Sequence, residues 1–402
     1  MNDLLQENNM NDHEPVIVGA LRTPVGKRGG RLQKWHPVDL LGETLRQLVE
    51  RSGINPADLD DVIVGCVLQW DQQHGNLGRH AVLAAGLPES VPAVTVDRQC
   101  GSGQQAVSFV VHGIQAGAYQ LAIGAGVESM SQAPMPPSFK PGAPLGAQYS
   151  PRELARYQGN PLIPQGASSE LMNKRFGLTR EALDAFAVRS HRRAIEASRA
   201  GRVQDQLVRL HEDPTDPDSP LVTADEGMRA DPNPEKMATL KPVFAADGAT
   251  TAANSSQISD GAAALLIASR AYAQQHGLKP RARFVSTAVA AADPVIQFTA
   301  VLDATRKALK ESGLTPADID LFEVNEAFGG VPLMFQQEFG IPDDRLNVNG
   351  GSVAIGHPLG STGARMLTDL LCELERRGGR YGLQTICEAS GTANTTIIER
   401  LA

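Results

Sequence analysis

The feature that most constrains the fold of this chain is an internal repeat. Residues 51–65 (RSGINPADLDDVIVG) match residues 311–325 (ESGLTPADIDLFEVN) at seven of fifteen positions, at a constant offset of 311 − 51 = 260. In each copy a helical pattern of apolar residues precedes a Ser-Gly stop and a short β-like run. We therefore predict an α/β protein built from a duplicated unit.

The two copies continue into matching strand-to-helix corners. In the first copy residues 93–96 read as a strand, and a helix is predicted to begin near Gln104, shortly after Cys100. In the second copy residues 346–348 lead through a turn at His357 into another helix. Cys100 and His357 therefore hold nearly equivalent places, and a pseudo-twofold packing of the copies would bring both to one cleft.

His357 lies in a glycine-dense turn. Between residues 349 and 365 five glycines occur, at positions 350, 351, 356, 360 and 363, and Pro358 follows the histidine. Glycine permits positive φ and a close approach of backbone to a ligand, and proline sets φ near a helix start. We predict that the imidazole faces a cleft and takes part in chemistry. The alternative is a plain helix entry with an incidental histidine.

Cys100 is the candidate nucleophile. Gly101 and Gly103 leave room for a substrate, and a position just before a helix exposes the sulfur to the positive end of the helix dipole, which favours the thiolate. An imidazole partner would complete a nucleophile for neutral pH. The alternative is a buried cysteine that acts as a small apolar side chain.

The other three cysteines differ in their surroundings. Cys387 ends an apolar strand before a turn of small residues, so core packing and catalysis are equally open for it. Cys66 and Cys372 have apolar neighbours and are predicted to pack in the interior. Because no CxxC pair or zinc-like spacing is present, we expect free thiols and no metal site.

The composition fits a globular protein with two or more packed units. The chain has 402 residues, more than one core usually organises, and 42% of them are hydrophobic. A net charge of −8 argues against a general nucleic-acid binder, whose surface would be basic. Residues 1–15 are polar and acidic, unlike a targeting peptide, and no apolar run approaches the roughly 18 to 20 residues that span a bilayer. We expect a soluble, cytoplasmic protein.

The stretch between the copies, residues 131–257, has a different character. Thr179 is a plausible N-cap for a helix that runs to about Ala200. Its arginines are expected to form a solvated face, with phosphate binding as the alternative; they are Arg189, Arg192 and Arg193. The stretch opens with prolines that favour an extended excursion, namely Pro134, Pro136, Pro137, Pro141, Pro144 and Pro151.

Together these residues carry a resemblance to the thiolase family that covers nearly the whole chain. Residues 25–30, 97–100 and 396–401 are most similar to degradative actinobacterial thiolases, including those that act on steroid side chains. The supporting motifs occur in the order typical of the family: Arg22-Thr23-Pro24-Val25-Gly26, Cys100-Gly101-Ser102-Gly103, Gly126-Val127-Glu128-Ser129-Met130-Ser131, Asn254-Ser255-Ser256, Asn325-Glu326-Ala327-Phe328, the His357 segment and Cys387.

The resemblance implies a thiolase fold, in which two duplicated mixed-sheet domains form five layers, αβαβα, with an inserted loop domain. Residues 1–130 would form the N-terminal domain, completed by residues 258–279. Residues 131–257 would form the CoA-binding loop domain, and residues 280–402 the C-terminal domain. The repeat at offset 260 supports this division independently.

The resemblance also implies an acyltransferase that cleaves 3-oxoacyl-CoA with CoA, or runs the reverse Claisen condensation. Cys100 would attack the substrate, His357 would accept its proton, and Cys387 would protonate the acetyl-CoA carbanion. Asn325, through a water, and His357 would surround the thioester oxygen. Backbone N–H groups of Cys100 and Ala389 would stabilise the second oxyanion.

No tightly bound cofactor is implied, because CoA is a substrate. Arg229 would contact its nucleotide end and Ser256 its pantetheine, while Ala327 and Phe328 would line the pantetheine channel. The expected partners are CoA and acyl-CoA thioesters, with no nucleic acid and no membrane. The expected assembly is a homodimer or a homotetramer.

Several residues depart from the family pattern. Ala389-Ser390-Gly391 replaces the usual glycine triplet after the second cysteine, and added Cβ atoms narrow the pocket and penalise positive φ. This predicts a changed or smaller acyl site, or reduced turnover. Gln165 stands where methionine is common and Gln257 where glycine is usual, both where acyl or pantetheine groups would pass.

Three functions are compatible with these observations. The first is an active thiolase. The second is a decarboxylating, ketosynthase-like condenser, which would ordinarily want two histidines beside the cysteine. The third is a catalytically weakened acyl-CoA-binding protein, for which the altered turn at Ala389 is the support. The joint presence of Cys100, His357, Cys387 and Asn325 favours the active thiolase.

Overall fold

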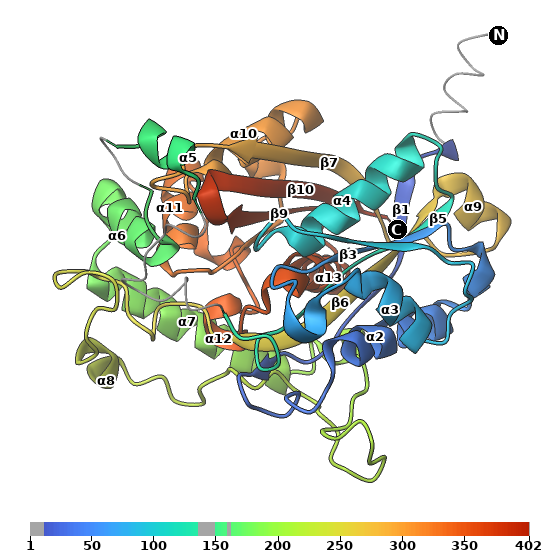
Figure 1. Cartoon of the computed structure of the whole chain (residues 1–402). Coiled ribbons are helices and arrows are strands. Elements are labelled where there is room, and N and C mark those ends of the chain that lie inside the picture. Colours follow the sequence, from blue (N-terminus) through green and yellow to red (C-terminus); the bar gives the residue numbers. More distant parts are fainter. Residues whose placement is uncertain (1–11, 136–148, 159–161, 402) are drawn as a thin grey trace.

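The computed structural model describes residues 12–135, 149–158 and 162–401 (Figure 1). Most of the polar N-terminal stretch, and the predicted excursion at Pro136, Pro137, Pro141 and Pro144, lie outside these residues. Within the described ranges, none of the helices combines the length and apolar character needed to cross a bilayer.

The first half of the chain contains β1 (Pro15–Arg22), β2 (Gly26–Lys27), α2 (Pro37–Ser52), β3 (Asp61–Gly65), α3 (Leu77–Ala84), β4 (Ala93–Val96), α4 (Ser102–Gln115) and β5 (Leu121–Ser129). The middle contains α5 (Pro151–Arg156), α6 (Gln165–Phe176), α7 (Arg180–Arg199), α8 (Pro234–Ala238), β6 (Ser259–Ser269) and α9 (Arg270–Gln275). The second half contains β7 (Ala282–Ala291), α10 (Ala300–Ser312), β8 (Leu321–Val324), α11 (Gly330–Phe339), α12 (Ser352–Ile355), α13 (Leu359–Arg377), β9 (Tyr381–Glu388) and β10 (Thr392–Arg400). Short 3₁₀ turns span Pro56–Asp58, Asp71–Gln73, Gln204–Gln206, Pro316–Asp318, Asp343–Arg345 and Ala389–Gly391.

Strand order confirms the duplication. The first half-sheet runs β1-β6-β5-β3-β4 and the second runs β7-β10-β9-β8. Equivalent neighbours pair in the same direction: β5 with β6 and β9 with β10 are antiparallel, whereas β3 with β5 and β8 with β9 are parallel. The counterpart of β4 is reduced to one parallel bridge between Phe322 and Leu346. The half-sheets join through a short antiparallel contact between β1 and β7.

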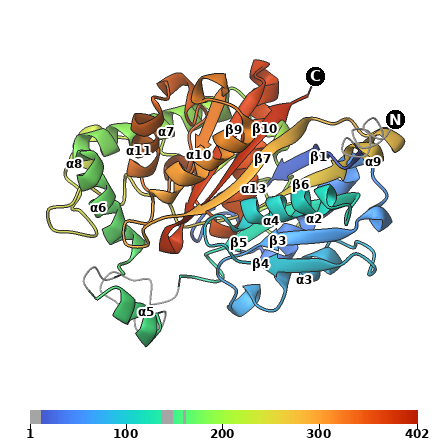
Figure 2. The same ribbon diagram turned by 90° about the horizontal axis from the view of Figure 1, so that it is seen from above.

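The elements stack in five layers, as predicted. Helices α2 and α3 cover the outer face of the first half-sheet, and α10 and α11 cover that of the second (Figure 1, Figure 2). Helices α4 and α13 pack against each other between the two half-sheets. Each interface has its own apolar core, and the middle one joins Val107 and Val110 of α4 to Leu367 and Leu370 of α13. Burial of these faces is the main favourable contribution to folding.

The Ser-Gly stops predicted from the repeat end equivalent helices. Gly53 after α2 and Gly313 after α10 adopt left-handed conformations, with φ of 67° and 70°. A residue without Cβ takes this conformation at little cost, and the left-handed turn lets the chain leave the helix for the following strand. The helices therefore end where the sequence predicts.

Glycines at the crossing of the two halves position the site. A Cβ on Gly103 would lie 2.6 Å from the carbonyl oxygen of Gly360, and a Cβ on Gly126 would overlap the same oxygen. The start of α13 therefore sits directly on the start of α4 and the end of β5. Glu128 reinforces the contact, because its Oε2 accepts a hydrogen bond from the Gly360 N–H at 2.8 Å.

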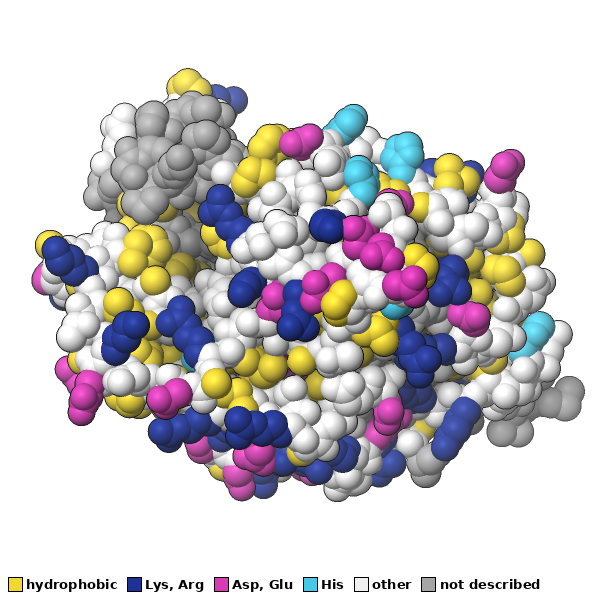
Figure 3. All heavy atoms as spheres, turned by 90° about the horizontal axis from the view of Figure 1, so that it is seen from below, with side chains coloured by type: hydrophobic (Ala, Val, Ile, Leu, Met, Phe, Trp, Pro, Cys, Tyr) yellow, Lys and Arg dark blue, Asp and Glu magenta, His cyan; other side chains and the backbone are white. Residues whose placement is uncertain are grey.

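The predicted helix after Thr179 is present as α7, and the Thr179 side chain accepts a hydrogen bond from the Ala182 N–H. Two of its arginines are structural, because Arg189 and Arg193 both pair with Asp343. On the face seen in Figure 3, basic and acidic side chains lie intermingled rather than in one basic field.

Candidate active site

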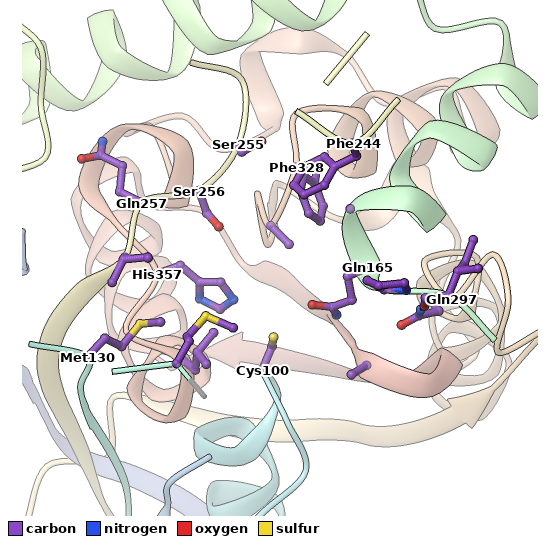
Figure 4. A pocket seen from close by; sticks show the side chains of 18 of the residues that line it. Cys100, Met130, Gln165, Phe244, Ser255, Ser256, Gln257, Gln297, Phe328 and His357 are labelled. Carbon is purple, nitrogen blue, oxygen red and sulfur yellow. The ribbon is translucent and has the colours of Figure 1, made fainter. Parts of the chain in front are cut away.

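A cavity of about 280 Å³ lies where the starts of α4 and α13 meet the segment inserted between β5 and β6. Figure 4 shows the Cys100 sulfur and the His357 ring facing the same space from the two halves of the molecule. The predicted site residues that line this cavity are Cys100, Ser256, Ala327, Phe328, His357 and Ala389.

Cys100 lies just before α4, as predicted, but its electrostatics differ from the prediction. Burial and the nearby Glu388 carboxyl raise the pKa of the Cys100 thiol to about 12, and they outweigh the opposing effect of its own backbone N–H. The prediction of a thiolate in the unliganded protein is therefore wrong, because a helix terminus cannot compensate for removal of the anion from water. A base must remove the thiol proton when substrate is present.

His357 is oriented to act as that base. Its Nδ1 lies 2.7 Å from Thr362 Oγ1, and this hydroxyl donates to the carbonyl oxygen of Pro358. Thr362 must then accept from Nδ1–H, so Nε2 carries the lone pair of the ring. Burial, and then the positive charge of Arg365, lower the pKa of His357 to about 3. The imidazole is therefore neutral at physiological pH.

A buried chain of side chains holds Asn325 beside this histidine. Asn325 Nδ2 lies 3.3 Å from His357 Nε2. Its Oδ1 accepts a hydrogen bond from Ser352 Oγ at 2.7 Å, and Arg365 donates to the same serine at 3.3 Å. Sequence reasoning missed Ser352, Thr362 and Arg365, although all three lie in or beside the glycine-dense His357 segment that it singled out.

Cys387 is not among the residues that line the cavity. It ends β9, is fully buried and belongs to the apolar core under α10. Burial, and next the neighbouring Cys100 thiol, raise its pKa well above the ordinary value. The structure therefore brings Cys387 close to the Cys100 sulfur. In the protein without ligand, the Cys387 thiol is neutral.

Glu388 is a fourth residue that sequence reasoning missed. It follows Cys387 on β9, so its side chain points to the opposite face, where a Cβ on Gly101 would overlap its Oε1. Oε2 accepts a hydrogen bond from Thr392 Oγ1 at 2.6 Å, and Oε1 has no partner among the described residues. Burial raises the pKa of Glu388 to about 8. A carboxylate at the end of a strand, next to the candidate catalytic Cys387, was the available sequence signal.

Glu388→Gln is expected to change the reactivity of Cys100 at alkaline pH. Below about pH 8 Glu388 is neutral, whereas above it the carboxylate opposes formation of the Cys100 thiolate. If the Glu388 carboxylate raises the pKa of the Cys100 thiol by about one unit, its removal would speed alkylation of Cys100 by iodoacetamide roughly tenfold at pH 9. Rates measured from pH 6 to 9.5 would test this, with Glu399→Gln on β10 as control. Equal rates for Glu388→Gln and the native protein at pH 9 would contradict it.

The altered turn after Cys387 carries strain at one of its two replaced glycines. Ser390 has a φ of 63°, whereas Ala389 is not in the left-handed region. A residue with Cβ in this conformation costs roughly 1 to 2 kcal/mol. The Ser390 N–H donates to Gln297 Oε1 at 3.0 Å, which helps to hold the turn. The expected penalty therefore falls on Ser390, while Ala389 lines the cavity.

The wall opposite Cys100 is where the sequence predicts the pantetheine channel. The Ser256 N–H donates to the Ala327 carbonyl oxygen at 3.0 Å, so the two motifs lie side by side. Phe328 stacks edge-on against Phe244 and Phe298. Gln257 points its amide away from the cavity (Figure 4), toward the carbonyl oxygens of Gly227, Val353 and Ala354. It therefore ties the inserted segment to α12 without obstructing the channel.

Arg229 lies outside this cavity. It is exposed and lines a separate pocket with His191, Asp231 and Lys236. Its N–H donates to His191 Nδ1 at 3.2 Å. Burial, and then the positive charge of Arg229, lower the pKa of His191 to about 4.

Comparison with known proteins agrees with the fold. Residues 15–271 match the family model of the thiolase N-terminal domain, and residues 278–400 match that of the thiolase C-terminal domain. The chain is 46% identical to steroid 3-ketoacyl-CoA thiolase FadA6 of Mycobacterium tuberculosis, over 96% of this chain and 94% of that protein. It is 38% identical to 3-ketoacyl-CoA thiolase of Bacillus subtilis, over 96% and 99%.

A solved structure extends this similarity to three dimensions. The crystal structure of Bacillus anthracis acetyl-CoA acetyltransferase superposes with a TM-score of 0.87 at 35% identity, and covers 98% of this chain and 100% of that one. Both halves, their order and their packing therefore agree with known members. The chain belongs to the thiolase family of acyltransferases.

Proposed function

We propose that this chain cleaves 3-oxoacyl-CoA with CoA to give acetyl-CoA and a shortened acyl-CoA, or runs the reverse condensation. The observation that carries the proposal is that Cys100 and His357 face one cavity from equivalent corners of the two halves. The names of the relatives, steroid 3-ketoacyl-CoA thiolase and 3-ketoacyl-CoA thiolase, support the same reaction.

The first half-reaction needs a proton acceptor because the Cys100 thiol is neutral. His357 Nε2 takes that proton while the sulfur attacks the 3-keto carbon. The bond between C2 and C3 then breaks, and its electron pair forms the acetyl-CoA enolate. Cys387, close to the Cys100 sulfur, donates the proton that converts the enolate to acetyl-CoA, and the remaining acyl group stays on Cys100 as a thioester.

In the second half-reaction CoA takes the acyl group. The proton that His357 took from Cys100 first restores the Cys387 thiol, so His357 can then remove the proton of the CoA thiol. The CoA sulfur attacks the Cys100 thioester, the Cys100 sulfur leaves and takes that proton back from His357, and the shortened acyl-CoA is released. We propose that His357 and, through a water, Asn325 bind the thioester oxygen, and that the backbone N–H groups of Cys100 and Ala389 stabilise the oxyanion on the acyl carbon. Each such donor can contribute about 3 to 4 kcal/mol of transition-state stabilisation.

The CoA chain is proposed to pass Ser256, Ala327 and Phe328, with its nucleotide end near Arg229. This would make residues 131–257 the CoA-binding insertion between the halves formed by residues 1–130 with 258–279 and by residues 280–402. The separation of the Arg229 pocket from the catalytic cavity fits a long ligand that spans both. No tightly bound cofactor is needed for this chemistry.

Assembly as a homodimer, alone or as half of a homotetramer, is proposed from the open edge of the first half-sheet. Strand β4 pairs with β3 on one side only. Large apolar side chains on this half are exposed: Val94 on β4 by 41%, Leu83 on α3 by 45% and Phe109 on α4 by 41%. An open edge with such neighbours is suited to pairing with a second copy.

We also propose that the protein is located in the cytoplasm.

A thiolysis assay over 3-oxoacyl-CoA substrates of graded length tests the proposal. Substrate loss should depend on added CoA and should yield equal amounts of acetyl-CoA and shortened acyl-CoA. A weakened acyl-CoA-binding protein would bind these thioesters without cleaving any of them. A decarboxylating condenser is disfavoured because His357 is the one histidine among the described residues that lines the cavity.

A further inference from the structure

The catalytic cavity has a polar wall on the side away from the pantetheine channel. Figure 4 shows Ser255, Ser256 and Gln257 on one side of the space and Gln165 and Gln297 on the other. The rest of the cavity lining is mostly apolar and includes Met130, Met135 and Ile163. The side-chain amides of Gln165 and Gln297 are unexpected in this lining, because a hydrocarbon chain would offer them no hydrogen bonds.

The amide of Gln297 is fully used by the protein. Its Nε2 donates to the carbonyl oxygen of Ile163 and to Ser168 Oγ, both at 2.9 Å. Its Oε1 accepts from the Ser390 N–H at 3.0 Å. Gln297 therefore fixes the turn after Cys387 and has no donor left for a ligand.

The amide of Gln165 is different. Gln165 is the first residue of α6, and its side chain points into the cavity, toward Cys100 and His357 (Figure 4). Its Nε2 is buried and has no hydrogen-bond partner among the residues that the structure describes. The neighbouring position is closely packed, since a Cβ on Gly166 would overlap the ring of Phe244. A buried donor without an acceptor is unfavourable in the free protein, and a bound acceptor relieves that cost.

We infer that Gln165 determines specificity by donating a hydrogen bond to an oxygen atom that the acyl chain carries in addition to its 3-oxo group. The inference rests on the proposed thiolysis and specifies its substrate class: acyl chains with a further carbonyl, hydroxyl or carboxylate oxygen, rather than plain hydrocarbon chains. A pocket built around a hydrogen-bond donor discriminates strongly against an analogue that lacks the acceptor.

The test compares two 3-oxoacyl-CoA substrates of equal length, one with a second oxo group along the chain and one without. The native protein should show at least about tenfold higher kcat/KM for the dioxo substrate. Gln165→Met, which keeps the side-chain length and removes the donor, should reduce this preference to about twofold or less. Gln165→Glu, which replaces the donor by an acceptor, should lose the preference as well.

Acetoacetyl-CoA, too short to carry the extra oxygen, reports whether the catalytic groups remain intact in each variant. Its cleavage should change less than about threefold in Gln165→Met. The inference is overturned if the native protein shows no preference for the dioxo substrate, or if Gln165→Met retains it. If the native protein cleaves none of the three thioesters, the proposed function fails and this inference fails with it.

Discussion

Replacing Cys100 by alanine is expected to lower kcat for thiolysis by at least about 10⁴-fold, because no other group can carry the acyl chain between the two half-reactions. Cys387 is not expected to substitute, since its thiol is fully buried in the apolar core under α10 and is assigned to proton transfer at the acetyl-CoA carbon. The measurement is CoA-dependent cleavage of acetoacetyl-CoA and of one longer substrate, with mass spectrometry of the intact protein to detect the acyl-enzyme.

The control for this variant is Cys372→Ala. Cys372 is a half-buried residue of α13 whose thiol contacts Arg281, and it does not line the cavity. It should retain activity within about twofold. Cys100→Ala should still bind acyl-CoA, because the channel at Ser256 and Phe328 is unchanged. Activity of Cys100→Ala above about 1% of native would show that the acyl group does not pass through this sulfur.

Replacing His357 by asparagine is expected to cost about 10²- to 10⁴-fold in kcat/KM, the usual contribution of a positioned general base. The loss should be severe because burial, which raises the Cys100 pKa to about 12, leaves almost no thiolate for the reaction without a base. His112→Asn, an exposed histidine on the same helix that Cys100 precedes, is the matched control and should stay within about twofold.

The pH profile of the native protein gives a second test of His357. A base with a pKa of about 3 is competent above that value and is lost only as the pH falls toward it. The kcat/KM profile between pH 5 and 7.5 should therefore lack the step near 6.5 that an ordinary histidine would give. A clear loss of activity centred near pH 6.5 would show that His357 titrates there, contrary to the effects of burial and Arg365.

Much of the fold is visible in the sequence because it depends on local patterns. The repeat predicted the duplicated units, and the Ser-Gly stops predicted the ends of α2 and α10. The corner at Cys100 and the glycine-dense corner at His357 predicted two reactive groups in equivalent places. Even the family departures were useful, since Ser390 carries the predicted strain and Gln165 supplies an unpartnered donor.

Other features of the site were not predictable, because they depend on contacts between distant residues. Glu388 affects Cys100 only because the end of β9 packs against Gly101. Arg365 lowers the His357 pKa and reaches Asn325 only through Ser352. The predicted thiolate was wrong for the same reason, since burial of Cys100 is a property of the assembled halves.

The sequence by itself determined which groups this protein has and at which corners they stand, because periodicity, glycine placement and the repeat act over a few residues. The tertiary structure decided how those groups ionise and which of them reach the cavity. Desolvation and charge pairing depend on the packing of α4, α13 and β9 around them, and no run of neighbouring residues encodes that packing.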